Sequence, residues 1–262
     1  MIRALHTASS GMNAQQMNID NIANNLSNVN TVGFKRSRMN FQDLVYQNLQ
    51  VPGTPSTDNT IYPTGLQIGL GIRPISSQKH YAQGVLMQTE NPLDLSIEGD
   101  GFFQVTMPDG SIAYTRDGGF KIDGEGNLVT SEGYMVEPAI NIPVDSVAVS
   151  VGVDGTITAL APGDNEPQEV GRINLARFAN PAGLMNIGRN LLKETAASGD
   201  PVVGDPGQEG MGSISSGFLE MSNVDVVKEM VEMIRAQRAY QINSRVIRGS
   251  DEMLQTVADI KR

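Results

Sequence analysis

The chain has 262 residues and a mass of 28.1 kDa, enough for one large domain or two small ones. Its net charge of −10 argues against a nucleic-acid-binding protein, because phosphate recognition needs clustered Lys and Arg. The sequence contains no cysteine, which excludes disulfides, a thiol nucleophile and Cys-based zinc sites.

The negative charge is concentrated in the middle of the chain. Residues 1–39 carry a net +3, residues 218–262 are balanced, and residues 40–217 carry a net −13. This division suits a molecule whose ends pack against copies of themselves, because like charge opposes close assembly. Ordinary acidic solubility explains it equally well.

No stretch of the sequence is long and apolar enough to predict insertion into a membrane. Polar residues near the N-terminus also interrupt the apolar run of a cleavable signal peptide. If the protein leaves the cytoplasm, we expect it to use another export route.

A seven-residue spacing of apolar side chains predicts a long helix over about the first 28 residues. The row consists of Leu5, Met12, Ile19 and Leu26. The row three positions earlier includes the polar Ser9 and Gln16. An Asn-rich run up to Gly33 predicts that the helix ends near Asn28, and the N-terminal assembly segment is placed at residues 1–39.

Residues 40–92 are expected to form an extended linker or arm. The stretch 52–61 is rich in Pro, Thr, Ser, Gly and Asn, a composition typical of linkers. The glycines at Gly69 and Gly71 precede no helical segment that could bind a phosphate, so they also indicate extended backbone.

Residues 93–197 are predicted to form an antiparallel β domain. Asp-Gly turn signals recur there between short apolar or β-branched runs, such as Gly101–Met107 and Ile112–Arg116. Alternating valines over 147–153 and the run 156–158 predict a hairpin. A polar return linker is expected over 198–221, which completes an α+β fold with terminal helices and an inserted β domain.

A second seven-residue row predicts a C-terminal helix within 222–262. It contains Val226, Met233, Tyr240, Ile247 and Leu254. Ser222, with Asp225 three residues later, resembles a capping box, and Gly249 is the weakest point of the helix.

Both terminal helices need partners, because isolated helices are marginally stable in water. They could close on each other as a hairpin within one monomer, or pack against copies in a coiled-coil-like layer. The polar row containing Ser9 and Gln16 leaves a two-helix pair underfilled, which favours additional neighbours.

The sequence predicts no catalytic residue, cofactor site or metal site. His6 and His80 have no Cys to pair with, and Asp123, Glu125 and Asn127 do not continue as a calcium loop, since Tyr134 stands where a bidentate Glu is needed. Paired carboxylates for glycoside hydrolysis remain a weak alternative, because the acids show no distinguishing spacing.

Two terminal motifs resemble the bacterial flagellar rod and hook axial proteins. The N-terminal motif comprises 10–16, 21–28 and 31–35, and the C-terminal motif comprises 222–225 and 236–244. The residues that carry the resemblance are Asn24, Asn25, Asn28, Asn30, Gly33, Phe34, Ser222, Asn223, Gln237, Arg238 and Tyr240. Leu66–Pro74, Gly99–Val105 and Ala113–Phe120 are most similar to the distal-rod branch. A proximal-rod or hook-type subunit is the alternative within the family, and a secreted β-rich adhesin is the alternative outside it.

The resemblance implies a structural subunit that polymerises into a hollow rod of the flagellar basal body, crossing the periplasm as drive shaft and export conduit. The terminal helices would form the inner tube, and the β domains would face outward. Implied partners are copies of the chain, neighbouring proximal-rod and hook subunits, surrounding ring proteins and the flagellar type III export apparatus. Neither nucleic acid nor membrane insertion is implied.

The resemblance also associates the segment 46–71 with a straight, stiff rod. Three prolines would restrict its backbone, and two glycines lie near its end. These residues are Pro52, Pro55, Pro63, Gly69 and Gly71.

Overall fold

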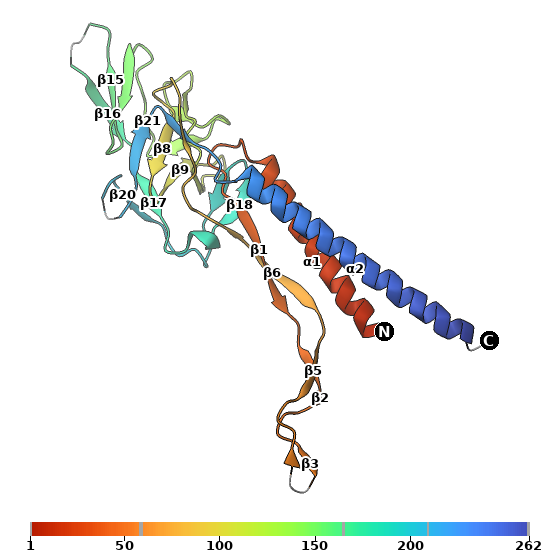
Figure 1. Cartoon of the computed structure of the whole chain (residues 1–262). Coiled ribbons are helices and arrows are strands. Elements are labelled where there is room, and N and C mark those ends of the chain that lie inside the picture. The colour runs from red at the N-terminus through yellow and green to blue at the C-terminus, as the bar shows by residue number, and fades with distance from the viewer. Residues whose placement is uncertain (1, 58–59, 164–165, 209, 261–262) are drawn as a thin grey trace. The chain divides into compact units, whose positions relative to one another are not determined.

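The computed structural model describes residues 2–57, 60–163, 166–208 and 210–260. The chain divides into two compact units, each built from segments distant in sequence. The helical unit combines Met1–Leu26, Ser37–Gln78 and Asp225–Arg262, and the β unit combines Ser27–Arg36 with Lys79–Val224. A helix near each end of the chain and antiparallel strands between them confirm the predicted α+β class (Figure 1).

In the helical unit, α1 (Ile2–Ser27) and α2 (Val226–Ile260) lie side by side and antiparallel (Figure 1). The remainder of this unit is a long hairpin, which we call the arm, over residues 37–78. In the arm, β1 (Ser37–Asp43) pairs with β6 (Ile72–Lys79), and β2 (Tyr46–Gln50) pairs with β5 (Leu66–Gly69). The hairpin ends with β3 (Pro55–Thr57) and β4 (Thr60–Ile61).

The helix ends follow the local sequence signals, with one correction at a cap. α1 ends at Ser27, as expected, and α2 continues through Gly249. The predicted cap at Ser222 is wrong, because Asp225 Oδ1 accepts the backbone N–H groups of Val227 and Lys228 at 3.0 and 3.2 Å. Asp225 directly precedes the first helical residue, the position from which a side chain reaches those two donors.

In the β unit, one antiparallel sheet has the order β11-β12-β13-β9-β10-β19-β18, and β17 joins β9 to β20. These strands are β9 (Phe102–Thr106), β10 (Ile112–Thr115), β11 (Lys121–Ile122), β12 (Leu128–Val129), β13 (Met135–Glu137), β17 (Leu175–Arg177), β18 (Met185–Gly188), β19 (Leu191–Lys193) and β20 (Val202–Gly204).

Smaller antiparallel sheets complete the unit. β14 (Ala148–Val151), β15 (Thr156–Leu160) and β16 (Gln168–Arg172) form one of them, which confirms the predicted valine-rich hairpin. β8 (Leu95–Glu98) pairs with β21 (Ser213–Ser216), and β7 (Leu86–Gln88) pairs with β22 (Phe218–Glu220). A short 3₁₀ helix spans Pro181–Gly183.

The core of the β unit lies on both faces of β9. Successive side chains of a strand point to opposite faces, so Phe103 and Phe102 belong to different clusters. Phe103 packs edge-on against Phe120 with ring centroids 5.1 Å apart, and Phe102 packs against Phe178 at 5.9 Å. Each fully buried aromatic side chain contributes roughly 1.5–3 kcal/mol, so this unit contains its own source of stability.

Candidate functional site

Small and polar side chains line the contact between α1 and α2, which we call the seam. Asn25 is fully buried, and its Nδ2 donates a hydrogen bond to Glu229 Oε2 at 3.1 Å. Nearer the other end of α1, a Cβ on Gly11 would lie 2.9 Å from Asn243 Nδ2. Asn25 and Gly11 are fourteen residues apart, as are Glu229 and Asn243, so the antiparallel register is the same at both contacts.

One row of α2 residues, spaced seven positions apart, faces the seam. This row consists of Glu229, Ala236, Asn243 and Ser250. Three of its members are at most 3% exposed, while Asn243 is half-buried. The row lets the helices approach closely but buries little apolar surface, so the seam alone contributes little hydrophobic stabilisation.

The predicted apolar rows lie beside the seam. Met12 follows Gly11, and successive helical residues are rotated by about 100°, which turns the Met12 row away from α2. Leu5, Met12, Ile19, Leu26, Val226, Met233 and Ile247 are half-buried, whereas Tyr240 and Leu254 are 38% and 36% exposed. Their own chain leaves these rows partly uncovered.

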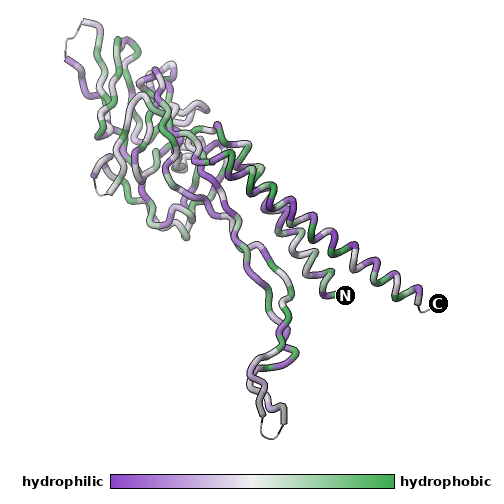
Figure 2. The backbone as a smooth tube through the Cα atoms, in the orientation of Figure 1, coloured by the Kyte–Doolittle hydropathy of each residue, from purple (hydrophilic) through white to green (hydrophobic). Residues whose placement is uncertain are grey.

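Helix α2 exposes further large apolar side chains. They are Val227, Met230, Val231, Ile234, Ile242, Val246, Met253 and Val257, each at least 44% exposed. Figure 2 shows hydrophobic positions recurring along the whole helix. Because these positions extend around the helix, one partner helix cannot cover them all.

The C-terminal end of α2 extends past α1 (Figure 1). In the register set by Asn25 and Glu229, Ile2 lies opposite Glu252, so the turns of α2 after that residue have no facing turn of α1. Met253 and Val257 in this overhang are 52% and 55% exposed.

One buried asparagine links both helices to the arm. Besides Glu229, Asn25 Nδ2 donates to the carbonyl oxygen of Ser37 at 2.8 Å, and its Oδ1 accepts the Ser37 N–H at 2.9 Å. Asn21 donates to the same carbonyl at 2.9 Å. The Asn-rich motif therefore fixes the first residue of β1 against α1.

The predicted stiffening residues lie along the arm, and one of them contacts α1. Gly71 has φ +118°, and a Cβ there would lie 2.2 Å from Ser10 Oγ, so glycine allows the arm to approach the helix. Gly69 lies against the Tyr46 ring. The prolines have separate positions: Pro52 follows β2, Pro55 begins β3 and Pro63 follows β4.

In the β unit, Glu220 binds three distant chain segments through one buried carboxylate. Its Oε1 accepts Lys35 Nζ at 2.6 Å and the Gly84 N–H at 2.8 Å, and its Oε2 accepts Arg116 Nη1 at 3.3 Å. Burial lowers the pKa of Lys35 and of Arg116, while the charge of Glu220 opposes both shifts.

Asn223 and Gly33 join the same segments through backbone groups. Asn223 Oδ1 accepts the Arg36 N–H at 2.7 Å, and its Nδ2 donates to the carbonyls of His80 and Ala82, each at 2.8 Å. The Gly33 N–H donates to the Glu220 carbonyl at 2.8 Å.

We call the set Gly33, Lys35, Arg116, Glu220 and Asn223 the chain crossing. At Gly33, φ is +68° and a Cβ would lie 2.7 Å from the backbone carbon of Arg116. Lys35, Arg116 and Glu220 were not predicted as site residues. Two of them stand within recognised motifs, but no sequence spacing indicates that they meet.

The other motif residues have separate surroundings. Phe34 lies under the Lys79 ammonium at 5.4 Å, Asn28 Oδ1 accepts the Thr31 hydroxyl at 3.1 Å, and Ser222 Oγ accepts the Val224 N–H at 3.3 Å. A final group, Asn24, Asn30, Gln237 and Arg238, is exposed.

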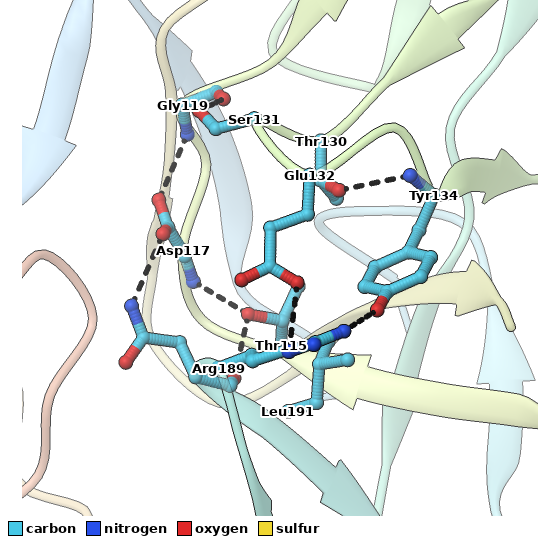
Figure 3. Close-up of a pocket in the computed structure, with 10 residues that line it drawn as sticks. Thr115, Asp117, Gly119, Thr130, Ser131, Glu132, Tyr134, Arg189 and Leu191 are labelled. Carbon is cyan, nitrogen blue, oxygen red and sulfur yellow. Dashed lines mark hydrogen bonds and ion pairs between the residues drawn. The ribbon is translucent and has the colours of Figure 1, made fainter.

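A cavity of about 160 Å³ in the β unit is lined by polar side chains that form hydrogen bonds and an ion pair with one another (Figure 3). Arg189 pairs with Glu132 at 3.3 Å and donates to the Tyr134 hydroxyl, while Asn190 Nδ2 donates to Asp117 at 3.2 Å. These bonds hold the β18–β19 turn, where Arg189 and Asn190 both have positive φ. Among the residues that line this cavity, no nucleophilic side chain is hydrogen-bonded to a general base, the arrangement that nucleophilic catalysis needs.

Within the described ranges, no group of three His, Cys, Asp or Glu side chains could hold a metal ion. Neither helix, over its described residues, combines the length and hydropathy that a membrane span requires.

Three family descriptions match successive parts of the chain. "Flagella basal body rod protein" matches residues 5–35, "Flagellar hook protein FlgE/F/G D1 domain" matches 96–159, and "Flagellar basal body rod FlgEFG protein C-terminal" matches 215–260. The first and last include the motif residues of α1 and α2, and the middle match lies in the β unit.

Full-length relatives agree with these matches. The chain is 52% identical to the flagellar basal-body rod protein FlgG of Borreliella burgdorferi over 264 residues, covering 100% of each chain. It is 42% identical to FlgG of Bacillus subtilis over 268 residues, again covering 100% of each, and 44% identical to FlgG of Caulobacter vibrioides, covering 99% and 100%. By this full-length similarity, the chain belongs to the FlgG family, the structural distal-rod subunits of the flagellar basal body.

Proposed function

We propose that this chain polymerises through α1 and α2 into a hollow distal rod that transmits torque and encloses an export channel. Its partners are further copies, the adjoining proximal-rod and hook subunits, the surrounding ring proteins and the export apparatus. A relative with 32% identity, from Bacillus subtilis, is named a flagellar hook-basal body complex protein, which supports assembly with such components.

The exposed apolar surface of α2 carries this proposal. Monomeric soluble proteins rarely expose contiguous apolar patches beyond a few hundred Å², and larger patches mark interaction sites. The seam leaves the Met12 and Met233 rows half-buried, and the overhang adds Met253 and Val257. Each large side chain covered by a neighbouring copy would contribute roughly 1.5–3 kcal/mol.

We assign the assembly role to nine residues on the two helices. They are Leu5, Met12, Ile19, Leu26, Val226, Met233, Tyr240, Ile247 and Leu254. The terminal segments 1–39 and 222–262 then serve assembly. The predicted return linker over 198–221 is wrong, because β20, β21 and β22 within it pair with strands of the β unit.

A stiffening role for the arm completes the proposal. Pro52, Pro55 and Pro63 fix their φ angles, and Gly71 lets the base of the arm contact α1. A restrained arm could limit bending between neighbouring subunits. The polar network around Arg189 already satisfies its own charged groups, which supports a structural role over an enzymatic one.

The test replaces one apolar residue of each helix by a charge. Leu26→Asp and Ile247→Asp should abolish polymers in electron micrographs of the purified full chain, because a carboxylate cannot be buried unpaired between helices. Circular dichroism should show that the monomers retain their β structure.

Val144→Asp is the matched control. Val144 is 73% exposed in the β unit, so this variant introduces the same charge away from the helices and should polymerise like the unmodified chain. Normal polymers from both helix variants would contradict the assignment of the assembly surface.

A further inference from the structure

A small cavity beside the chain crossing is walled by positive charge. Its volume is about 20 Å³, and its charged lining residues are Lys35, Lys79 and Arg116. A cavity needs about 10–15 Å³ to hold one water-sized particle. This cavity therefore has room for a particle the size of a water molecule or a monatomic ion.

Several N–H groups of these cations have no acceptor in the described part of the chain. Arg116 is 5% exposed, and its Nε is buried without a hydrogen-bond partner. Lys35 Nζ donates to Glu220 and to the Ala82 carbonyl, which leaves one of its three N–H groups. The structure shows no hydrogen bond or ion pair for Lys79 over the residues it describes, and the ammonium lies over the Phe34 ring.

Nearby carboxylates do not balance the three cations. Glu220 pairs with Lys35 and Arg116 and does not line the cavity. Asp100 adds a favourable charge near Arg116 but is exposed and also lies outside the lining. Lys79 has no carboxylate within ion-pair distance in the described ranges, so one positive charge is left over.

The surrounding chemistry favours an acceptor over water. Burial lowers the pKa of Lys79, the direction expected for an ammonium that is partly desolvated and has no carboxylate partner. Burial also raises the pKa of Tyr81 to about 12, so this lining hydroxyl stays protonated and able to donate. A water molecule accepts at most two hydrogen bonds, whereas an anion accepts from every side and also carries the charge that the cations lack.

We propose that this cavity binds one monatomic anion such as chloride, held by Arg116 Nε and the ammonium groups of Lys35 and Lys79. The bound ion neutralises the unmatched charge and gives the spare donors an acceptor. Chloride in solution should therefore stabilise the folded β unit.

Thermal unfolding of the unpolymerised full chain tests the proposal. Circular dichroism would compare melting in sodium chloride and in sodium gluconate of equal ionic strength. We expect the melting temperature in chloride to be higher by about 2–4 °C. Lys79→Met should abolish that difference, while Lys121→Met, the same loss of charge at an exposed position of β11, should keep it.

Equal melting of the unmodified chain in both salts would overturn the site, and so would a chloride effect that persists in Lys79→Met. Lys79→Gln is a second variant if the Met variant folds poorly. Crystals of the full chain soaked in bromide give an independent measurement. An anomalous-scattering peak between Arg116 and Lys79 supports the site, and its absence contradicts it.

Discussion

At the scale of single residues, the fold depends on a few side chains that join distant segments. Asn25 satisfies backbone groups of Ser37 and also reaches Glu229, and Glu220 accepts hydrogen bonds from three segments of the β unit. Asn25 and Glu220 are both buried. Replacing either one would leave its partners buried without a hydrogen bond, and water could not reach them to take its place.

Gly33 should be far less tolerant of substitution than other glycines with positive φ. Gly33→Ala would combine left-handed strain with a Cβ 2.7 Å from backbone atoms of Arg116 and Asp117, lowering the free energy of unfolding by roughly 2–6 kcal/mol. Gly110 has φ +80° and no atom within 4 Å of an added Cβ, so Gly110→Ala should lower the free energy of unfolding by only about 1–2 kcal/mol. Urea unfolding measures both, and equal losses would show that the close approach at Gly33 is unimportant.

At the scale of elements, the two helices differ in how much their own chain covers them. Neighbours in the chain bury Ala8, Ala14 and Ile22 of α1, whereas α2 keeps large apolar side chains exposed along its length. The start of α2 is fixed independently of that packing, by the carboxylate of Asp225 on the first-turn N–H groups.

Asp225→Ala should destabilise the start of α2 by about 1 kcal/mol, because two first-turn N–H groups lose their acceptor. Asp225→Asn keeps an acceptor oxygen and should retain most of the stability that Asp225→Ala loses. Hydrogen exchange of the first-turn amides measures the change. Fraying no greater in the Ala variant than in the Asn variant would contradict the capping role.

The same residue predicts a pH dependence in acid. Hydrogen bonds from the backbone and side chain of Lys228 hold the pKa of Asp225 below its usual 3.8. The charged form is therefore favoured in the folded chain, so its contribution is present above about pH 4 and is lost as pH falls through the lowered pKa. Asp225→Asn has no proton to gain and should lack this part of the acid loss.

At the scale of the whole molecule, both compact units contain segments far apart in the sequence. The β unit includes Ser27–Arg36, which follows directly after α1, and the helical unit includes the arm. Folding of the β unit therefore requires a piece of the N-terminal motif, because Lys35 and Arg36 bond to residues near position 220.

Two truncations should separate these contributions. A chain of residues 27–262 and a chain of 37–262 both lack α1, but only the shorter one loses Gly33 and Lys35. Removing one partner of a buried ion pair typically costs about 3–5 kcal/mol, so the β unit of the shorter chain should melt at a lower temperature. Calorimetry of both chains gives the comparison, and identical β-unit transitions would contradict a structural role for the chain crossing.

Local sequence signals determined the two helices and the valine-rich hairpin, but not the paired strands of the arm or of residues 202–220. Seven-residue apolar rows, the Asn-rich run before Gly33 and the Asp-Gly turns depend on neighbours within a few positions, so both helices and the valine-rich hairpin could be predicted. The terminal motifs likewise pointed to the flagellar axial family. Capping was less well determined, because both Ser222 and Asp225 carry suitable oxygens.

Tertiary structure alone decided which residues meet. The row that faces α2 contains Gly11 and Asn25 beside the apolar Met12 row, a difference of one position that helical periodicity cannot resolve without the partner helix. The meeting of Lys35, Arg116 and Glu220 depends on chain segments separated by up to 185 positions. No local propensity encodes such a contact, because it forms only when the β unit brings those segments together.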